Sequence, residues 1–210
     1  MAILEELRAA VVDGLAKVAV AKVDEALAAG IEAGTLLRES LIAGMAEVGQ
    51  LYEEGEVFVP EMLVAARAMS AALAVLKPHL VAEGVPSNGR VAIGTTQGDL
   101  HDIGKNLVAM MLEGSGYEIV DLGVDVPAAK FIEAIRGGAN VVAMSALLTT
   151  TMTNMQSTIE AIREAGLREQ VRIIVGGAPI TKSYADEIGA DGYAEDASSA
   201  VRLVKEVLAA

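Results

Sequence analysis

The stretch best suited to chemistry runs from residue 98 to residue 106 and reads Gly-Asp-Leu-His-Asp-Ile-Gly-Lys-Asn. It places one imidazole, His101, between two carboxylates, Asp99 and Asp102, with glycines on both sides that let a bound group approach the backbone. An imidazole whose other ring nitrogen is held by a carboxylate is a typical metal ligand. On spacing alone, an equally open alternative is that Asp102 caps a helix and His101 is an ordinary loop residue.

The elements around this stretch decide where it would lie. The apolar run at 91–93 predicts a buried strand, and the run at 107–112 predicts a helix. His101 is therefore expected at the carboxyl end of a strand, the edge at which open parallel sheets bind their ligands.

Composition narrows the class of protein. The 210 residues are 53% hydrophobic, enough for one large domain or two small ones, and only 3% are aromatic. The absence of cysteine excludes disulfides, thiolate metal sites and cysteine nucleophiles. The formal net charge of -13 argues against a nucleic-acid-binding surface.

No membrane or export segment is expected. The sequence lacks an uninterrupted apolar run of about 18 residues, and its start, Met-Ala-Ile-Leu-Glu-Glu, lacks the basic residues of a signal peptide. A cytoplasmic location is the default prediction.

The first part of the chain predicts a helical bundle. Apolar residues recur every three or four positions, and glycines divide the region into helices at about 2–12, 15–29, 35–53 and 60–82. Short connections make neighbouring helices antiparallel, and Pro60 suits a first helical turn. Turn-forming residues at 83–89 predict a linker.

From Arg90 onward, strands alternate with helices. This pattern predicts a parallel sheet covered on both faces, with the flavodoxin-like strand order 2-1-3-4-5. The loop after the third strand, at 145–151, would then meet the loop that holds His101. Strands are expected at 90–95, 117–121, 140–145, 171–175 and 191–194, and helices at 103–114, 128–136, 152–165, 181–188 and 197–208.

The nine residues at 98–106 resemble the cobalamin-binding signature of corrinoid proteins and cobalamin-dependent methyltransferase modules, carried here by Asp99, His101 and Gly104. The resemblance implies that His101 replaces the cofactor's benzimidazole as the lower ligand to cobalt. It also implies a hydrogen-bond relay from His101 through Asp99 to a hydroxyl, which by motif position is Thr151. Asp99 could instead be a turn former, and Thr151 or Thr153 could cap a helix.

The resemblance implies further cofactor contacts. Ser145 and Thr149 occupy positions that contact the nucleotide tail, paired glycines leave a slot for it, and Ala197 aligns with a contact near the benzimidazole. The expected cofactor-binding residues are Gly98, Asp99, Leu100, His101, Asp102, Ile103, Gly104, Ser145, Leu147, Thr149, Thr151, Gly176, Gly177, Ala197, Tyr52 and Val59. Asp99, His101 and Thr151 are the residues expected to take part in catalysis.

The helical part resembles the cap over the upper face of methylcobalamin in methionine synthase and small corrinoid proteins. Tyr52 and Val59 stand where the family has a phenylalanine and a leucine that shield the methyl group. Tyrosine adds a hydroxyl and valine is smaller, so the seal is expected to be looser. Alternatively, both are ordinary core residues of the bundle.

Other motifs are read as scaffold. The segment 121–127 indicates strand, turn and helix start, with acidic residues as rim contacts. Gly94-Thr95-Thr96 lacks the ending of a P-loop, and Lys105 is expected on the surface. His79 is expected at a helix end without a ligand role.

The resemblance spans the chain and implies a helical cap at 1–84 and a cobalamin-binding α/β domain at 85–210. It implies a stand-alone methyl carrier, not catalytic alone, that alternates between Co(I) and methyl-Co(III). Its expected partners are a substrate-specific methyltransferase, a second methyltransferase acting on tetrahydrofolate or coenzyme M, and a reductive activation protein. The alternatives are a cobalamin sensor, the small subunit of a carbon-skeleton mutase, and a flavodoxin-like interaction domain without cobalamin.

Overall fold

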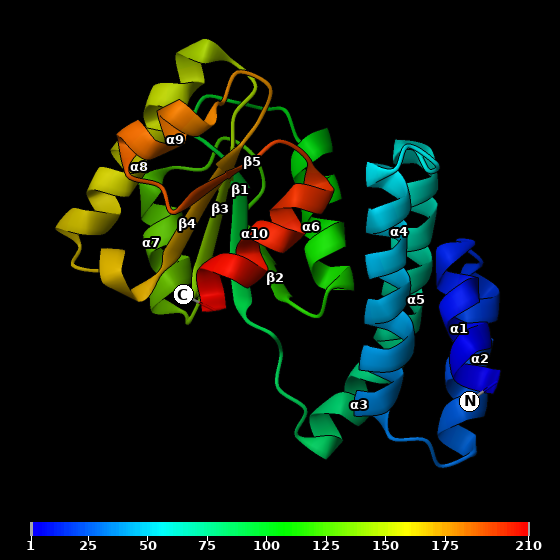
Figure 1. Cartoon of the computed structure of the whole chain (residues 1–210). Coiled ribbons are helices and arrows are strands. Elements are labelled where there is room, and N and C mark those ends of the chain that lie inside the picture. Colours follow the sequence, from blue (N-terminus) through cyan, green and yellow to red (C-terminus); the bar gives the residue numbers. More distant parts are fainter. Residues whose placement is uncertain (1, 210) are drawn as a thin grey trace. The chain divides into compact units, whose positions relative to one another are not determined.

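The computed structural model describes residues 2–209 and divides the chain into two compact units. One unit comprises the residues up to 87 together with 113–116 and is helical. The other comprises 88–112 and 117–210 and contains the parallel sheet. Figure 1 shows the elements of both units in chain order.

The helical unit follows the predicted helices closely. The expected helix at 35–53 is present but starts two residues earlier and contains a π-helical segment, Leu37–Ile42. The longest helix packs against each of the others. The helices are α1 (Ala2–Val12), α2 (Ala16–Ala28), α3 (Ala33–Leu36), α4 (Ala43–Glu53) and α5 (Val59–Glu83).

Helix α5 is long and apolar enough to cross a membrane by length and composition alone. Three of its large apolar side chains, Met62, Met69 and Leu76, are fully buried, and the helix packs against the other helices of its unit. Pro60 lies in its first turn, as predicted, and Gly84 ends it in the left-handed conformation. The hydropathy of α5 is therefore that of a core helix.

The α/β unit has the predicted topology. Its five strands are all parallel in the order β2-β1-β3-β4-β5. The central strands are almost wholly apolar because both of their faces are covered. The strands are β1 (Arg90–Thr95), β2 (Glu118–Asp121), β3 (Val141–Ser145), β4 (Arg172–Gly176) and β5 (Gly192–Ala194), and the helices are α6 (Ile103–Gly114), α7 (Ala128–Arg136), α8 (Thr149–Glu164), α9 (Lys182–Ile188) and α10 (Ala197–Ala209).

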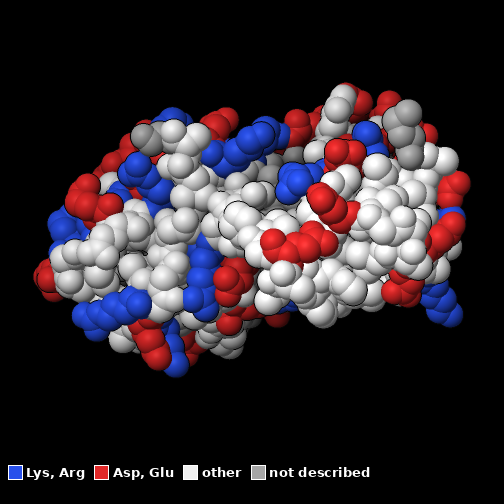
Figure 2. Space-filling view, turned by 90° about the horizontal axis from the view of Figure 1, so that it is seen from below, with Lys and Arg blue, Asp and Glu red and all other residues white. Residues whose placement is uncertain are grey.

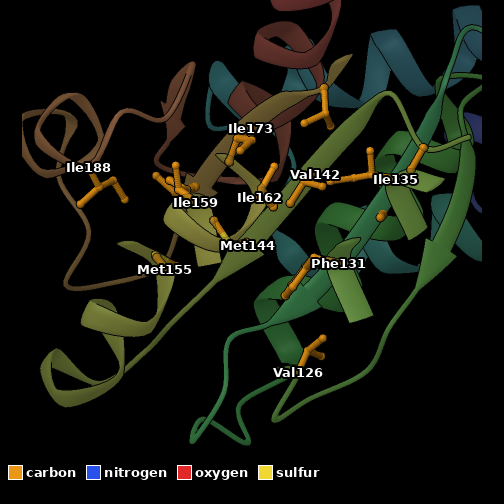
Figure 3. Close-up of a cluster of buried hydrophobic side chains, with 14 of the residues drawn as sticks. Val126, Phe131, Ile135, Val142, Met144, Met155, Ile159, Ile162, Ile173 and Ile188 are labelled. Carbon is orange, nitrogen blue, oxygen red and sulfur yellow. The ribbon is translucent and has the colours of Figure 1, made fainter. Parts of the chain in front are cut away.

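Two apolar cores hold the sheet between its helices. Phe131 of α7 and Met155 and Ile159 of α8 pack on one face (Figure 3). Leu112 of α6 and Val204 of α10 pack on the other. Figure 1 shows the corresponding division, with α7, α8 and α9 on one side of the sheet and α6 and α10 on the other. The sheet is therefore a rigid scaffold, and the loops at its edge can carry functional residues.

Two expectations about this unit were wrong. Helix α8 begins at Thr149 rather than at the predicted residue 152, with Leu148 as its N-cap residue, so the alternative in which Thr151 or Thr153 caps the helix does not hold either. Lys105 is buried, with only 2% of its side chain exposed, and its ammonium lies 2.7 Å from each carboxylate oxygen of Asp121. The ion pair ties the first turns of α6 to the end of β2.

Removing Lys105 and removing Asp121 are expected to have unequal effects on the stability of the fold. Asp121→Asn leaves the buried ammonium without a charged partner and should lower the free energy of unfolding by about 1–3 kcal/mol. Lys105→Met removes that charge while the half-exposed Asp121 stays hydrated, so its cost should be below about 1 kcal/mol. Urea unfolding of both variants checks the order, and a larger loss for Lys105→Met would contradict it.

Figure 2 shows lysine and arginine side chains lying among aspartate and glutamate side chains. The 29 acidic residues outnumber the 16 basic ones, and this excess of negative charge argues against a nucleic-acid-binding surface.

Candidate functional site

Three loops meet at the carboxyl edge of the sheet because β1 lies between β2 and β3. The loop after β1 carries Asp99 and His101, the loop after β2 carries Asp125, and the loop after β3 leads into α8. The position of His101 at a strand end and the meeting of the β1 and β3 loops were both predicted.

Asp99 is the centre of the site. It is 0% exposed, and both carboxylate oxygens accept hydrogen bonds. Oδ1 accepts from the His101 ring at 2.7 Å and from the His101 backbone N–H at 3.1 Å. Oδ2 accepts from the N–H groups of Leu147 (2.8 Å) and Leu148 (3.2 Å) and from the Thr151 hydroxyl (2.8 Å). One carboxylate thus joins the β1 loop to the N-terminus of α8.

These contacts set the charge of Asp99. Burial of the carboxyl raises its pKa, but hydrogen bonds from the Leu147 backbone, from the His101 ring and backbone and from Thr151 outweigh burial. The pKa of Asp99 therefore lies well below its ordinary value of 3.8. Asp99 is a fixed anion at the N-terminus of α8, where the helix dipole also favours negative charge.

His101 faces outward from this anion. Its side chain is 52% exposed while Nδ1 lies against Asp99 Oδ1. In the neutral ring the carboxylate holds the proton on Nδ1, so Nε2 keeps its lone pair and can bind another group. The alternative that His101 is an ordinary loop residue does not account for its pairing with a buried carboxylate.

Thr151 carries a hydroxyl with two acceptors. Its Oγ1 lies 2.8 Å from Asp99 Oδ2 and 2.9 Å from the Leu148 carbonyl oxygen, and a single hydroxyl proton serves one of them at a time. The structure thus brings together the three residues of the predicted relay, His101, Asp99 and Thr151.

The backbone of His101 is also held. Thr95, the last residue of β1, donates its hydroxyl to the His101 carbonyl oxygen at 2.8 Å. The Ser145 hydroxyl lies 3.3 Å from the Thr95 hydroxyl. Ser145, expected to contact the cofactor tail, is therefore part of the support of the β1 loop.

Exposed aliphatic side chains lie on the loops at the same edge of the sheet as His101. Leu100 is 72% and Ile103 81% exposed, and Val124, Leu147 and Leu148 are also exposed. These are the exposed large hydrophobic side chains of the α/β unit within the described residues, and all come from the loops after β1, β2 and β3 or the first turn of α6. Exposed apolar groups gathered at one edge are typical of a surface that a ligand covers.

Contacts within the protein explain why residues 176 and 177 are both glycine. A Cβ on Gly177, whose φ is +129°, would lie 1.9 Å from the Ala146 carbonyl oxygen, and one on Gly176 would lie 2.9 Å from that of Ala194. Backbone from neighbouring strand ends thus already requires glycine at both positions. A role for Gly176 and Gly177 toward a cofactor stays a prediction, as does that of Ala197, a buried residue that opens α10.

The expected cap residues lie in the helical unit. Tyr52 is half-buried in the last turn of α4, and Val59 is exposed at the first residue of α5. Neither is an ordinary core residue, so that alternative was wrong.

The acidic residues at the end of β2 and in the loop after it contact other groups of the protein. Asp121 pairs with Lys105 and accepts from the Gly123 N–H at 2.9 Å. Asp125 Oδ1 accepts from the Gly98 N–H at 2.7 Å. The Asp125 contact was missed from the sequence because its partner is 27 residues away and no short-range pattern links them.

Known proteins share both units of this chain. The B12 binding domain family matches residues 89–202, and a second family with the same description matches residues 3–77. The chain is 44% identical over 209 residues to trimethylamine corrinoid protein 1 of Methanosarcina acetivorans, which covers 98% of this chain and 97% of the relative. It is 38% identical over 212 residues to a corrinoid protein of Desulfitobacterium hafniense, with 99% and 98% covered. The chain belongs to the corrinoid protein family.

This corrinoid protein also resembles a chain in the crystal structure of the methanol:cobalamin methyltransferase complex of Methanosarcina barkeri. The TM-score is 0.88 at 28% identity, over 99% of this chain and 80% of that chain. The likeness confirms the predicted fold class, a helical N-terminal part followed by a five-stranded parallel α/β part. The cofactor of the corrinoid protein is cobalamin or a related corrinoid.

The residues at the sheet edge fit this cofactor. Within residues 2–209 no three His, Cys, Asp or Glu side chains are grouped to hold a bare metal ion. One imidazole supplies one ligand, so a metal bound by His101 must bring its other ligands with it, as cobalt in a corrin ring does. The aliphatic side chains around His101 suit the apolar edge of such a ring.

Proposed function

We propose that this chain is a methyl carrier that binds its corrinoid with His101 as the lower ligand to cobalt, in place of the cofactor's own base. The observation that carries the proposal is the outward-facing imidazole of His101, held through Nδ1 by the buried anion Asp99. The bound cofactor supplies a cobalt centre that accepts a methyl group from one enzyme and yields it to another.

The residues of the chain tune and hold that centre. Asp99 keeps the proton of His101 on Nδ1, which makes Nε2 the basic ligand nitrogen and fixes the plane of the ring. Asp99 Oδ1 would hold Nδ1, and so keep the ring in place, whether or not Nε2 were bound to cobalt. The Thr151 hydroxyl lies within hydrogen-bond distance of Asp99 Oδ2 and of the Leu148 carbonyl oxygen, so it can donate to either of them.

The names of the relatives support methyltransferases as the partners of this chain. Relatives of this chain are named trimethylamine and dimethylamine corrinoid proteins, and a neighbour in fold comes from a methanol methyltransferase complex. We assign this chain a substrate-specific methyltransferase as donor enzyme, a second methyltransferase acting on tetrahydrofolate or coenzyme M as acceptor enzyme, and a reductive activation protein. A cytoplasmic location is part of the proposal.

Two steps test the function. Hydroxocobalamin added to the apoprotein should give a stoichiometric complex with a changed absorption spectrum. The reduced complex should then be methylated by a methyltransferase specific for trimethylamine, dimethylamine or methanol, and demethylated by a coenzyme M or tetrahydrofolate enzyme. A chain that binds cobalamin but accepts a methyl group from no enzyme of this panel would count against the carrier role.

The helical unit, with a boundary at 84/85, is proposed as a cap that protects the upper face of the cofactor through Tyr52 and Val59. Both side chains are accessible in their own unit, as a ligand-shielding role requires. Their double replacement by alanine should speed cyanide binding to the upper face of bound hydroxocobalamin several-fold, in a stopped-flow absorption measurement. Exposed Val18→Ala on α2 is the control, and equal rates in the double variant and the control would contradict shielding.

A further inference from the structure

Asp125, in the loop after β2, forms two hydrogen bonds to the loop that carries His101. Its Oδ1 accepts from the Gly98 N–H at 2.7 Å, and its own backbone N–H donates to the Asp99 carbonyl oxygen at 2.9 Å. The two bonds run in opposite directions and bracket the peptide unit that joins Gly98 to Asp99. The side chain and the backbone of Asp125 therefore both hold the start of the loop that carries His101.

The backbone of Asp125 is shaped for this contact. Its φ is +53°, and it is the one non-glycine residue with positive φ in the part of the chain that the structure describes. Asp and Asn are the side chains that tolerate this conformation best. Backbone conformations of this unfavourable kind are concentrated at functional sites, and this one lies at the contact with the loop that carries His101.

The loop that carries Asp125 is itself anchored to β1. The Thr95 N–H donates to the Gly123 carbonyl oxygen, and the Val126 N–H donates to the Thr95 carbonyl oxygen, both at 3.0 Å. Thr96 and Val126 form a parallel bridge that extends the sheet. Asp125 is thus a fixed support with hydrogen-bonded chain on both sides.

The consequence reaches His101 through Asp99. Asp99 orients the imidazole with Oδ1, and the Gly98 N–H and the Asp99 carbonyl oxygen on either side of its Cα–N bond are the groups that Asp125 contacts. Asn154 of α8 steadies the same loop from another side, because its Nδ2 donates to the Gln97 carbonyl oxygen at 2.7 Å. The Asp99 backbone has two direct contacts: its carbonyl oxygen accepts from the Asp125 N–H, and its own N–H donates to the Thr96 carbonyl oxygen at 3.1 Å.

We propose that Asp125 is a positioning residue for the lower ligand: it sets Gly98 and Asp99 so that Asp99 presents His101 to cobalt. The inference rests on the proposed function, because it assumes that His101 is the ligand. We attribute this role of Asp125 to its hydrogen-bond acceptor oxygen and not to its negative charge. Asp125 is exposed to solvent, where a charge is screened, whereas a hydrogen bond of fixed direction still positions the loop.

Two variants separate the oxygen from the charge. Asp125→Asn keeps an acceptor oxygen and the tolerance of positive φ, so its dissociation constant for hydroxocobalamin should stay within about twofold of wild type. Asp125→Gly also accepts positive φ but removes the oxygen. It should fold, weaken cobalamin binding by about tenfold, and lower the fraction of bound cofactor with the histidine-on spectrum. Asp186→Asn, which removes an equal charge from an exposed pair with Lys182, is the matched control.

A second readout needs no cofactor. In the apoprotein, hydrogen exchange of the Gly98 amide should be slow in wild type and in Asp125→Asn and markedly faster in Asp125→Gly. Unchanged Gly98 exchange and an unchanged histidine-on fraction in Asp125→Gly would overturn the inference. Equal losses in Asp125→Asn and Asp125→Gly would overturn the role of the oxygen. A wild-type protein that binds cobalamin without histidine ligation would instead overturn the proposed function, whatever the Gly98 exchange shows.

Discussion

Replacing His101 with alanine is expected to abolish the histidine-on absorption spectrum of the bound cofactor and to weaken cobalamin binding by roughly a hundredfold. The variant loses the one imidazole that Asp99 orients toward the sheet edge. The fold should survive, because the side chain is half-exposed and its removal creates no cavity. The spectrum and a titration with hydroxocobalamin measure both effects.

The chain offers a matched control for this variant in its other histidine, His79. His79 is exposed on α5, in the helical unit. His79→Ala should bind cobalamin with wild-type affinity and spectrum. A His101→Ala protein that keeps the wild-type spectrum would show that the lower ligand is another group.

Asp99→Asn is expected to damage both the fold and the site. An asparagine offers one acceptor oxygen, so its amide N–H₂ must face some of the donors that now reach the buried carboxylate, either the His101 ring or the N-terminal groups of α8. Unpaired buried donors should lower the free energy of unfolding by about 2–4 kcal/mol. The histidine-on fraction should fall as well, because His101 loses its anionic partner.

The lowered pKa of Asp99 gives this loss a pH dependence. The carboxyl ionises more readily in the folded than in the unfolded chain, so its contribution to stability is complete above its ordinary pKa of 3.8 and fades as pH falls toward the lower folded value. Wild type should therefore lose stability on acidification below about pH 4, and Asp99→Asn should lose less over the same range.

A control from the same loop tests whether the effect belongs to Asp99. The exposed Asp102 accepts from the Asn106 side chain at 3.1 Å. Asp102→Asn should change the free energy of unfolding by less than about 0.5 kcal/mol. Urea unfolding at neutral and acidic pH compares the two variants, and equal stabilities for Asp99→Asn and Asp102→Asn would contradict the central place given to Asp99.

Much of this arrangement could be predicted because it depends on local patterns. Continuous apolar runs separated by helical periodicity are sufficient to give a parallel sheet covered on both faces. The spacing of Asp99 and His101 is two residues, so their contact is local and foreseeable. The strand order then places the loop after β3 and the first turn of α8, which carries Thr151, beside them.

The features missed depend on contacts between distant segments. Asp125 and Lys105 find partners in other loops or strands, and neither partner shares a motif with them. Lysine is usually exposed, so the sequence predicted an exposed Lys105, and this prediction was wrong. Helix α8 starts earlier than predicted because Asp99, far away in sequence, accepts the N–H groups that precede its first turn.

The nitrogen bound to cobalt can be observed directly in the paramagnetic, one-electron-reduced form of the bound cofactor. Electron paramagnetic resonance of the His79→Ala protein, made with ¹⁴N-histidine or with ¹⁵N-histidine, reports the ligand through its nuclear splitting. If His101 is the lower ligand, each cobalt line should change from a triplet to a doublet on ¹⁵N labelling. A triplet that persists in the labelled protein would assign the nitrogen to the cofactor's own base and contradict the account.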